Sequence, residues 1–360
     1  MTFNHHLLHW YDQHKRDLPW RHNPTPYSTL VSEIMLQQTR VEAVIPLYER
    51  FLKRFPDLES LASASQDEVL SYWQGLGYYS RARRLHETAQ ILTAKHGGCI
   101  PNSKAELLAL PGIGSYTAGA LLSIAFSQPV TAVDGNLLRI GARLFLIYEP
   151  INKAAAKTRI QAEFDKLIPL SRPGDFNQAL MDLGSRICIP KRPRCKECPV
   201  KDYCKAFEEG KTFVLPIRQA PKPPTPMGVI LYLVEAGEHI LLRQRQTGEF
   251  LQGMWELPWF EKKTSPLQKQ LSTAESWLIS QLGTYNPIQI WETEYVFSHR
   301  HWMMTVYHYN IAQPFSLLQE DKVQYRWQPF AQFDVVALPT VFKKVLQQGI
   351  PNSKSVSSPT

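Results

Sequence analysis

A proline-rich segment at 215–226 divides this chain of 360 residues into two parts with different patterns. The segment, LPIRQAPKPPTP, can form neither a regular helix nor a central strand, because proline fixes φ and lacks a backbone N–H. Before it, apolar residues recur with a period near 3.6, as in TLVSEIMLQQTRVEAVIPLYERFLKRF. After it, GVILYLVEAGEHILLRQR predicts two strands joined by a turn. The chain should therefore fold as an all-α domain followed by an α+β domain.

We place the helical domain at 1–212, the linker at 213–227, the α+β domain at 228–348 and a polar, disordered tail at 349–360. In the α+β domain, WMMTVYHYNI predicts a further strand, and the segments around 268–282 and 338–348 predict helices. Each of the two domains is long enough to bury its own core.

Composition indicates a soluble protein, with 44% hydrophobic and 20% charged residues. No stretch reaches the ~18 apolar residues of a membrane span, and the N-terminus lacks the features of an export signal. We therefore expect a cytoplasmic protein with no membrane partner. The net charge of +8 comes mostly from the part before the linker. It indicates either a solubilising surface or attraction to a polyanion such as nucleic acid.

Four of the five cysteines lie close together, in ICIPKRPRCKECPVKDYC. A reducing compartment disfavours disulfides there. A zinc ion and an iron–sulfur cluster both use thiolate ligands, and the spacing alone does not decide between them, although zinc sites usually contain paired C-x2-C units. The basic residues around the thiols could meet phosphates. The four residues are Cys188, Cys195, Cys198 and Cys204.

Two short motifs carry chemistry. LPGIGSYTAG places Gly112 and Gly114 between two helical segments, as a tight turn or as a hairpin that directs N–H groups at a phosphate oxygen. VDGN places Asp134 before a helix, where aspartate commonly serves as a cap. Capping and catalysis are compatible, because N–H donors keep a carboxylate charged.

The hairpin, VDGN and the cysteine spacing, in this order, resemble the helix-hairpin-helix DNA glycosylases of the endonuclease III and MutY group. The resemblance implies that the cysteines hold a 4Fe-4S cluster rather than zinc. Bifunctional members of the group carry a lysine in the hairpin that forms a Schiff base with the sugar. Tyr116 occupies that position here. The resemblance therefore implies base release without efficient strand cleavage.

The segment SEIMLQQTRV resembles the MutY signature and implies catalytic roles for several residues. Glu33, in a largely apolar helix, should have a raised pKa and protonate adenine at N7. Asp134 should remain ionised and stabilise C1′, electrostatically or through a transient covalent adduct. Asn136 should hold Asp134 through its side chain or act as a second cap, and Tyr116 should either orient the reaction or pack on the hairpin.

The resemblance also implies residues that handle DNA. A base must leave the duplex to reach the carboxylates, and Gln38 and Tyr78 match the family's wedge residues near the opposing base. In GYYSRARR, we predict that Arg81, Arg83 and Arg84 contact phosphates, although a solvated basic face is the alternative for each.

Residues 228–348 resemble the C-terminal domain of MutY, which is built like a Nudix hydrolase. The acidic REx2EExG motif of those hydrolases is absent, so nucleotide hydrolysis is not expected. Phe297, Ser298 and His299 match the loop that recognises 8-oxoguanine, although an isolated F-S-H could be only a polar turn.

The function that the resemblance implies is removal of adenine opposite 8-oxoguanine or guanine from double-stranded DNA in base excision repair. A monomer is expected, located in the cytoplasm on a bacterial-type nucleoid, with contacts to repair proteins through the linker. One alternative is an endonuclease III-like glycosylase/lyase for oxidised pyrimidines, which Tyr116 and Glu33 disfavour. Another is a non-catalytic DNA-binding module, which the intact Glu33 and Asp134 disfavour.

Overall fold

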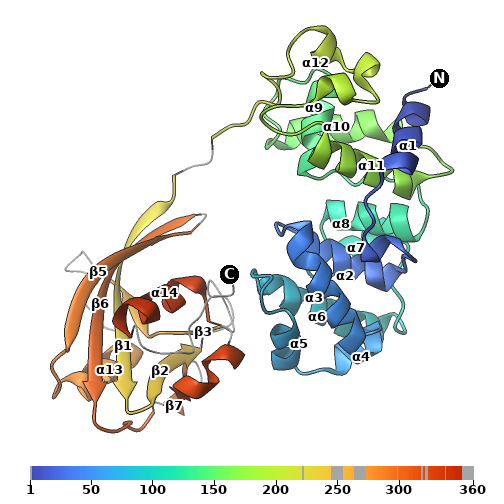
Figure 1. Cartoon of the computed structure of the whole chain (residues 1–360). Helices are drawn as coiled ribbons and strands as arrows, with labels where there is room; N and C mark the ends of the chain where they lie inside the picture. Colours follow the sequence, from blue (N-terminus) through green and yellow to red (C-terminus); the bar gives the residue numbers. More distant parts are fainter. Residues whose placement is uncertain are drawn as a thin grey trace. The chain divides into compact units, whose positions relative to one another are not determined.

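The structure is a computed structural model that describes residues 2–220, 223–244, 254–262, 273–297, 299–317, 319–320, 323–336 and 338–350. The chain forms two compact units, Met1–Ala220 and Pro221–Thr360, which we call the helical unit and the sheet unit (Figure 1). The change from an all-α to an α+β part agrees with the sequence pattern. No helix of the described residues is long and apolar enough to cross a membrane.

The helical unit consists of two lobes with separate cores. The first lobe follows η1 (Pro19–Arg21), and its core includes Phe51, Phe55 and Trp73, all fully buried. Its helices are α2 (Pro26–Leu36), α3 (Val41–Arg54), α4 (Leu58–Ser63), α5 (Gln66–Tyr72), α6 (Ser80–Lys95), α7 (Lys104–Leu108), and α8 (Ser115–Ala120), which continues as the π-helical η2 (Leu121–Ala125).

The second lobe combines the N-terminus with the residues after the hairpin. It contains α1 (Phe3–His14), α9 (Gly135–Leu144), α10 (Ala154–Asp165), α11 (Pro173–Arg186), and the short η3 (Cys195–Glu197), η4 (Lys201–Tyr203) and α12 (Lys205–Glu208). The helical pattern was predicted only from residue 28, so α1 is an addition. It begins at the Thr2 cap and buries Phe3, Leu7, Trp10 and Tyr11, which lie on one face at helical spacing.

Residues 213–220 differ from the sequence prediction, which assigned them to the linker. Leu215 is buried, and its carbonyl accepts a hydrogen bond of 2.8 Å from Arg143 Nε. The N–H of Ile151 donates to the carbonyl of Ile217 at 3.0 Å. These contacts hold the segment on the second lobe, so the helical unit extends to Ala220. The sheet unit begins earlier than predicted too, since β1 starts at Thr225.

The sheet unit is a mixed sheet between two helices. Its strands are β1 (Thr225–Ala236), β2 (His239–Gln244), β3 (Trp255–Glu256), β4 (Trp259–Glu261), β5 (Gln289–Val296), β6 (Arg300–Ile311), β7 (Gln319–Glu320) and β8 (Val323–Pro329), in the order β5-β6-β1-β2-β8-β7, with β3 on β2 and β4 on β1. β1 and β6 are parallel, and the other paired strands are antiparallel.

Alternation along β1 explains the two covered faces of the sheet. Val229, Leu231 and Leu233 pack in one core with α14 (Thr340–Gly349), while Tyr232 and Val234 pack in another with α13 (Thr273–Leu282). The short η6 (Phe330–Val335) precedes α14. The predicted tail at 349–360 lies outside the described residues from 351 onward.

Candidate active site and its cleft

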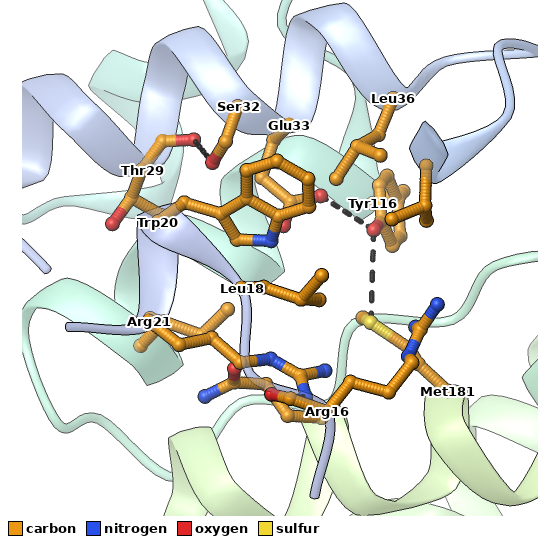
Figure 2. A pocket seen from close by; sticks show the side chains of 13 residues that line it. Arg16, Leu18, Trp20, Arg21, Thr29, Ser32, Glu33, Leu36, Tyr116 and Met181 are labelled. Atoms are coloured by element: carbon orange, nitrogen blue, oxygen red, sulfur yellow. Dashed lines mark hydrogen bonds between the residues drawn. The ribbon is translucent and has the colours of Figure 1, made fainter. Parts of the chain in front are cut away.

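Glu33 is a buried carboxylate in the last turns of α2, with 5% of its surface exposed. Its Oε2 accepts a hydrogen bond of 2.5 Å from the hydroxyl of Tyr116, which α8 supplies (Figure 2). Burial raises the pKa of Glu33 to about 7, the negative charge of Asp134 adds to this rise, and Tyr116 and Arg21 oppose it. A carboxyl group with this pKa can hold and release a proton near neutral pH, as a general acid must.

Tyr116 connects the hairpin to that carboxylate. Burial raises the pKa of its hydroxyl well above the usual value, and Glu33 and Asp134 raise it further. The hydroxyl therefore remains protonated and donates to Glu33. The hydroxyl oxygen of Tyr116 also lies 3.9 Å from Met181 Sδ.

Asp134 is the N-cap of α9 and faces the same cleft. Its Oδ1 accepts from the backbone N–H groups of Asn136 and Leu137 at 2.9 and 2.8 Å, and its Oδ2 accepts from Asn136 Nδ2 at 2.7 Å. Both predicted arrangements, the cap and the Asn136 side-chain bond, are present. Burial raises the pKa of Asp134 above its usual value; the three donors favour the charged form and reduce this rise without cancelling it.

A chain of hydrogen bonds continues from Asp134 to the cysteine loop. Arg139, 6% exposed, donates through Nη2 to Asn136 Oδ1 at 2.9 Å and through Nε to the carbonyl of Cys188 at 2.7 Å. Arg143, four residues later on α9 and 2% exposed, donates to Cys188 Sγ at 3.2 Å. Sequence reasoning missed both arginines. Their signal was present, because two arginines within the apolar run NLLRIGARLFLI must be paired when the helix is buried.

Two cavities meet at Glu33, Leu36 and Tyr116. The open cleft, about 720 Å³, is bordered by Gln38, Arg84, Asp134 and the hairpin 112–117. The smaller cavity, about 50 Å³, is drawn in Figure 2. Its other lining residues are Arg16, Leu18, Trp20, Arg21, Thr29, Ser32, Val41, Ile124, Gln178 and Met181. Glu33 thus borders both cavities, and Asp134 borders the open cleft.

The wall of the small cavity is fixed by a buried ion cluster that sequence reasoning missed. Asp182 is fully buried on α11, and Arg16 Nε and Arg21 Nη1 both donate to it at 2.8 Å. Burial acts to raise the pKa of Asp182, but Arg21 and Arg16 lower it overall, so its charge is retained. The cluster joins η1 and the segment before it to α11.

The hairpin has the geometry expected of a phosphate site. Gly112 has φ +77°, and a Cβ there would lie 2.9 Å from Arg84 Cβ, so only glycine fits. Gly114 is the N-cap of α8 and no side chain caps this helix end, which borders the open cleft. Arg84 is exposed beside it.

The four cysteines of the basic loop are close enough to influence one another, and their thiol groups could hold a metal centre. They influence one another electrostatically; burial raises the pKa of Cys198 to about 12, with contributions from the other three thiols. Backbone N–H groups reach the sulfurs of Cys198 and Cys204, and Arg143 Nη1 donates to the sulfur of Cys188 at 3.2 Å.

Comparison with known proteins gives the family. Residues 31–169 match the model of the HhH-GPD superfamily of base excision DNA repair proteins, and residues 229–348 match a NUDIX domain. The adenine DNA glycosylase of Buchnera aphidicola subsp. Baizongia pistaciae (strain Bp) is 36% identical over 308 residues, which are 81% of this chain and 86% of that protein. The chain belongs to the adenine DNA glycosylase family.

Other relatives agree. The adenine DNA glycosylase of Homo sapiens is 33% identical over 400 residues, which cover 95% of this chain and 72% of the human protein. Among solved structures, a thermostable thymine-DNA glycosylase superposes with a TM-score of 0.54 at 30% identity and covers 57% of this chain and 95% of its own. That structure matches this adenine DNA glycosylase family member over little more than half of its length, and its substrate base differs.

The predicted wedge residues lie on two exposed loops of this family member. Gln38 follows α2 and Tyr78 precedes α6; both are exposed, Tyr78 to 61%. Their φ angles are +59° and +46°, in the left-handed region that non-glycine residues rarely adopt. Such conformations persist only where surrounding contacts impose them, and they often occur at functional sites.

Arg81 does not have the position predicted for a phosphate contact. Only 9% of it is exposed, and its guanidinium donates six hydrogen bonds inside the protein, five of them to backbone carbonyls. The sequence placed it with Arg83 and Arg84 because RARR looks like a continuous basic face. The helix turns Arg81 inward and leaves Arg83 half-buried and Arg84 exposed.

In the sheet unit, the three residues predicted to recognise 8-oxoguanine differ in their surroundings. Phe297 packs against Tyr295 and Trp302, with ring centroids 4.8 and 5.0 Å away, and its N–H donates to the carbonyl of Arg300. It therefore anchors the β5–β6 turn; it is half-buried, and its contact with DNA stays a prediction. His299 is exposed on this turn. Ser298 lies outside the described residues.

Proposed function

We propose that this glycosylase excises adenine paired with 8-oxoguanine or guanine in duplex DNA, as a monomer, without efficient strand cleavage. Its family makes it a base excision repair enzyme, a hydrolase of N-glycosyl bonds that removes adenine. The observation that carries the proposal is that two buried carboxylates, Glu33 with one donor and Asp134 with three, face one cleft.

The two environments suit the two demands of the reaction. Adenine leaves poorly as an anion, so Glu33, protonated near pH 7, donates its proton to N7 while the bond from C1′ breaks and its electron pair passes to the purine. Asp134, held in its charged form by three donors, stabilises the positive charge that develops on C1′. Water then adds to C1′, and its proton goes to a carboxylate, which leaves an abasic site.

Strand cleavage has no nucleophile at the hairpin position where the bifunctional relatives carry lysine. Tyr116 stands there, and its raised pKa keeps the hydroxyl neutral and committed to Glu33. A phenol cannot form a Schiff base with the sugar. This supports a monofunctional enzyme.

We propose that Cys188, Cys195, Cys198 and Cys204 hold a 4Fe-4S cluster. When bound, the cluster serves as a structural cross-link of the basic loop at 188–204. The chain's own residues support this: Arg143 and several N–H groups are directed at the sulfurs, and Arg139 ties the Cys188 carbonyl to the Asn136–Asp134 pair.

DNA contacts are proposed for both units. The uncapped start of α8 and the exposed Arg84 suit a backbone phosphate, and Gln38 and Tyr78 suit insertion beside the opposing base. Ser298 and His299 are proposed to recognise the oxidised purine. Contacts with repair proteins are proposed for the prolines at 221–226, and the positive charge supports a location on the nucleoid of the cytoplasm.

The test is single-turnover release of adenine from three duplexes, with adenine opposite 8-oxoguanine, guanine or thymine. We expect release from the first two and little from the third. His299→Ala and Ser298→Ala should reduce the preference for 8-oxoguanine over guanine, whereas His96→Ala, at a half-buried position of the helical unit, serves as the control. Indifference of the wild-type enzyme to the opposing base would remove the role given to this turn.

The cluster is tested separately on the purified protein. Iron and sulfide in equal amounts, with an absorbance shoulder in the blue, are expected. Stoichiometric zinc without sulfide would show that the loop is a zinc site instead.

A further inference from the structure

The buried guanidinium of Arg81 connects the two loops that carry Gln38 and Tyr78 through its two terminal nitrogens, while its Nε has no hydrogen-bond partner in the described part of the chain. Its Nη1 donates to the carbonyls of Ile34, Met35 and Gln37 at 2.8, 2.8 and 2.6 Å. These carbonyls belong to the C-terminal end of α2, where a helix leaves acceptors unpaired and where a positive charge is favourable. One nitrogen of Arg81 therefore fixes the chain immediately before Gln38.

The other terminal nitrogen fixes the second loop. Nη2 donates to Thr39 Oγ1 at 3.0 Å, directly after Gln38, and to the carbonyls of Leu76 and Gly77 at 3.1 and 3.3 Å, directly before Tyr78. The guanidinium also lies over two rings, 5.6 Å from the centroid of Trp73 and 5.5 Å from that of Tyr78.

The position of Arg81 costs stability that a surface arginine would not cost. It lies in the first turn of α6, where the helix dipole disfavours a positive charge. Burial lowers its pKa to about 10, which still leaves it charged at neutral pH. In the described part of the chain no carboxylate pairs with it. The six oxygen acceptors therefore hold the charge, and in return the arginine closes both loops.

We propose that Arg81 is a positioning residue for base flipping, which holds Gln38 and Tyr78 together in their left-handed conformations as one preformed wedge. Two separate loops that each had to adopt a strained conformation on contact with DNA would lose binding free energy in that ordering. Because the hydrogen bonds of Arg81 clamp both loops in the free protein, the strained conformations form during folding and not on contact with DNA. This inference rests on the proposed function, because the wedge role of Gln38 and Tyr78 belongs to it.

The test is a double-mutant cycle. Arg81→Lys keeps the charge but cannot reach all six acceptors. Base flipping is followed by the fluorescence of 2-aminopurine in place of adenine, and excision by single-turnover release of adenine opposite 8-oxoguanine. In the wild-type background we expect Arg81→Lys to slow both by roughly tenfold or more, a loss typical of coupled neighbours. In the background Gln38→Ala/Tyr78→Ala it should cause little further loss.

Several outcomes would overturn the proposal. Equal losses in the two backgrounds would mean that Arg81→Lys acts through general destabilisation. A slope of log Kd against log salt that falls by about 1 on Arg81→Gln would make the residue a phosphate contact, since a buried positioning residue leaves the slope unchanged. A wild-type enzyme that does not release adenine opposite 8-oxoguanine would instead refute the proposed function.

Two further variants protect the test against misfolding. Thr39→Ala removes one acceptor of the six and should lower the flipping rate by a smaller factor, about two- to threefold. If Thr39→Ala leaves the flipping rate unchanged, and Arg81→Lys lowers it only in proportion to the fraction of unfolded protein, the proposal that Arg81 holds the two loops is wrong. Arg50→Lys is the matched control, because Arg50 is exposed in the same lobe and, among the described residues, donates a single hydrogen bond, to the carbonyl of Tyr72 at 3.0 Å. It should leave both rates unchanged.

Discussion

The end of α2 and the start of α9 each present a buried carboxylate to the same cleft, but the two carboxylates accept different numbers of hydrogen bonds. Around Glu33, apolar burial dominates and a single phenol donates to the carboxylate, so its pKa rises to about 7. Around Asp134, three donors meet the carboxylate and oppose the effect of burial. The comparison shows how one cleft can supply a proton at one edge and a negative charge at the other.

The largest expected effect is at the acid. Glu33→Gln keeps the shape and can still accept from Tyr116, but it has no proton to give. Loss of a general acid lowers rates by roughly 10²–10⁴-fold, and we expect the upper end in single-turnover adenine release. Glu49→Gln, at an exposed position of α3, is the control. Retained activity in Glu33→Gln would mean that another residue is the proton donor.

Asp134→Asn removes the negative charge of the second carboxylate. The amide can still be held in place by neighbours but carries no negative charge, and we expect single-turnover release to fall by roughly 10³-fold, as for loss of a preorganised electrostatic stabiliser. Asp57→Asn is a matched control, since Asp57 caps α4 in the same way, with Ser60 N–H at 2.8 Å. Full activity of Asp134→Asn would refute the mechanism.

The raised pKa of Glu33 also predicts a pH effect on stability. Its folded pKa lies above the unfolded value, so its contribution is fully present below about pH 4.5 and is lost as pH rises through about 7. A difference of this size corresponds to about 3 kcal/mol. The stability of Glu33→Gln relative to wild type, measured by urea unfolding, should therefore increase between pH 5 and pH 8. A gap independent of pH would contradict the raised pKa.

The smallest expected effect tests whether the donors around Asp134 keep it ionised. Asn136→Ala removes one of three donors to the carboxylate and so raises the pKa of Asp134 further. Because the ionised form is needed, activity should be lost at a higher pH as the solution is acidified, with a decrease of about tenfold near neutral pH, worth one charge-assisted hydrogen bond. Asn152→Ala, which removes an exposed asparagine bonded to Gln219, should leave the pH profile unchanged.

Local patterns predicted the fold class and the order of the motifs, because these depend on neighbouring residues, whereas the roles of the two carboxylates came from the family resemblance. The 3.6 period predicted the helices from α2 onward, and an aspartate before NLLRIGARLFLI predicted the cap that Asp134 forms. Glu33 in an apolar helix predicted the raised pKa. Apart from Asn136, the partners of Arg139 and Arg143 could not be predicted, since they lie 45 to 72 residues away in the sequence.

What the sequence by itself determined is therefore which groups are present: two carboxylates, a tyrosine in place of the hairpin lysine, four spaced cysteines, and a proline-rich boundary between two domains. The tertiary structure decided which groups meet. Arg81 is the clearest case, since within RARR nothing local distinguishes it from Arg83 and Arg84. Only the close packing of α6 on the end of α2 buries its side chain, and only there do six oxygens from chain segments up to 47 residues away converge on one guanidinium.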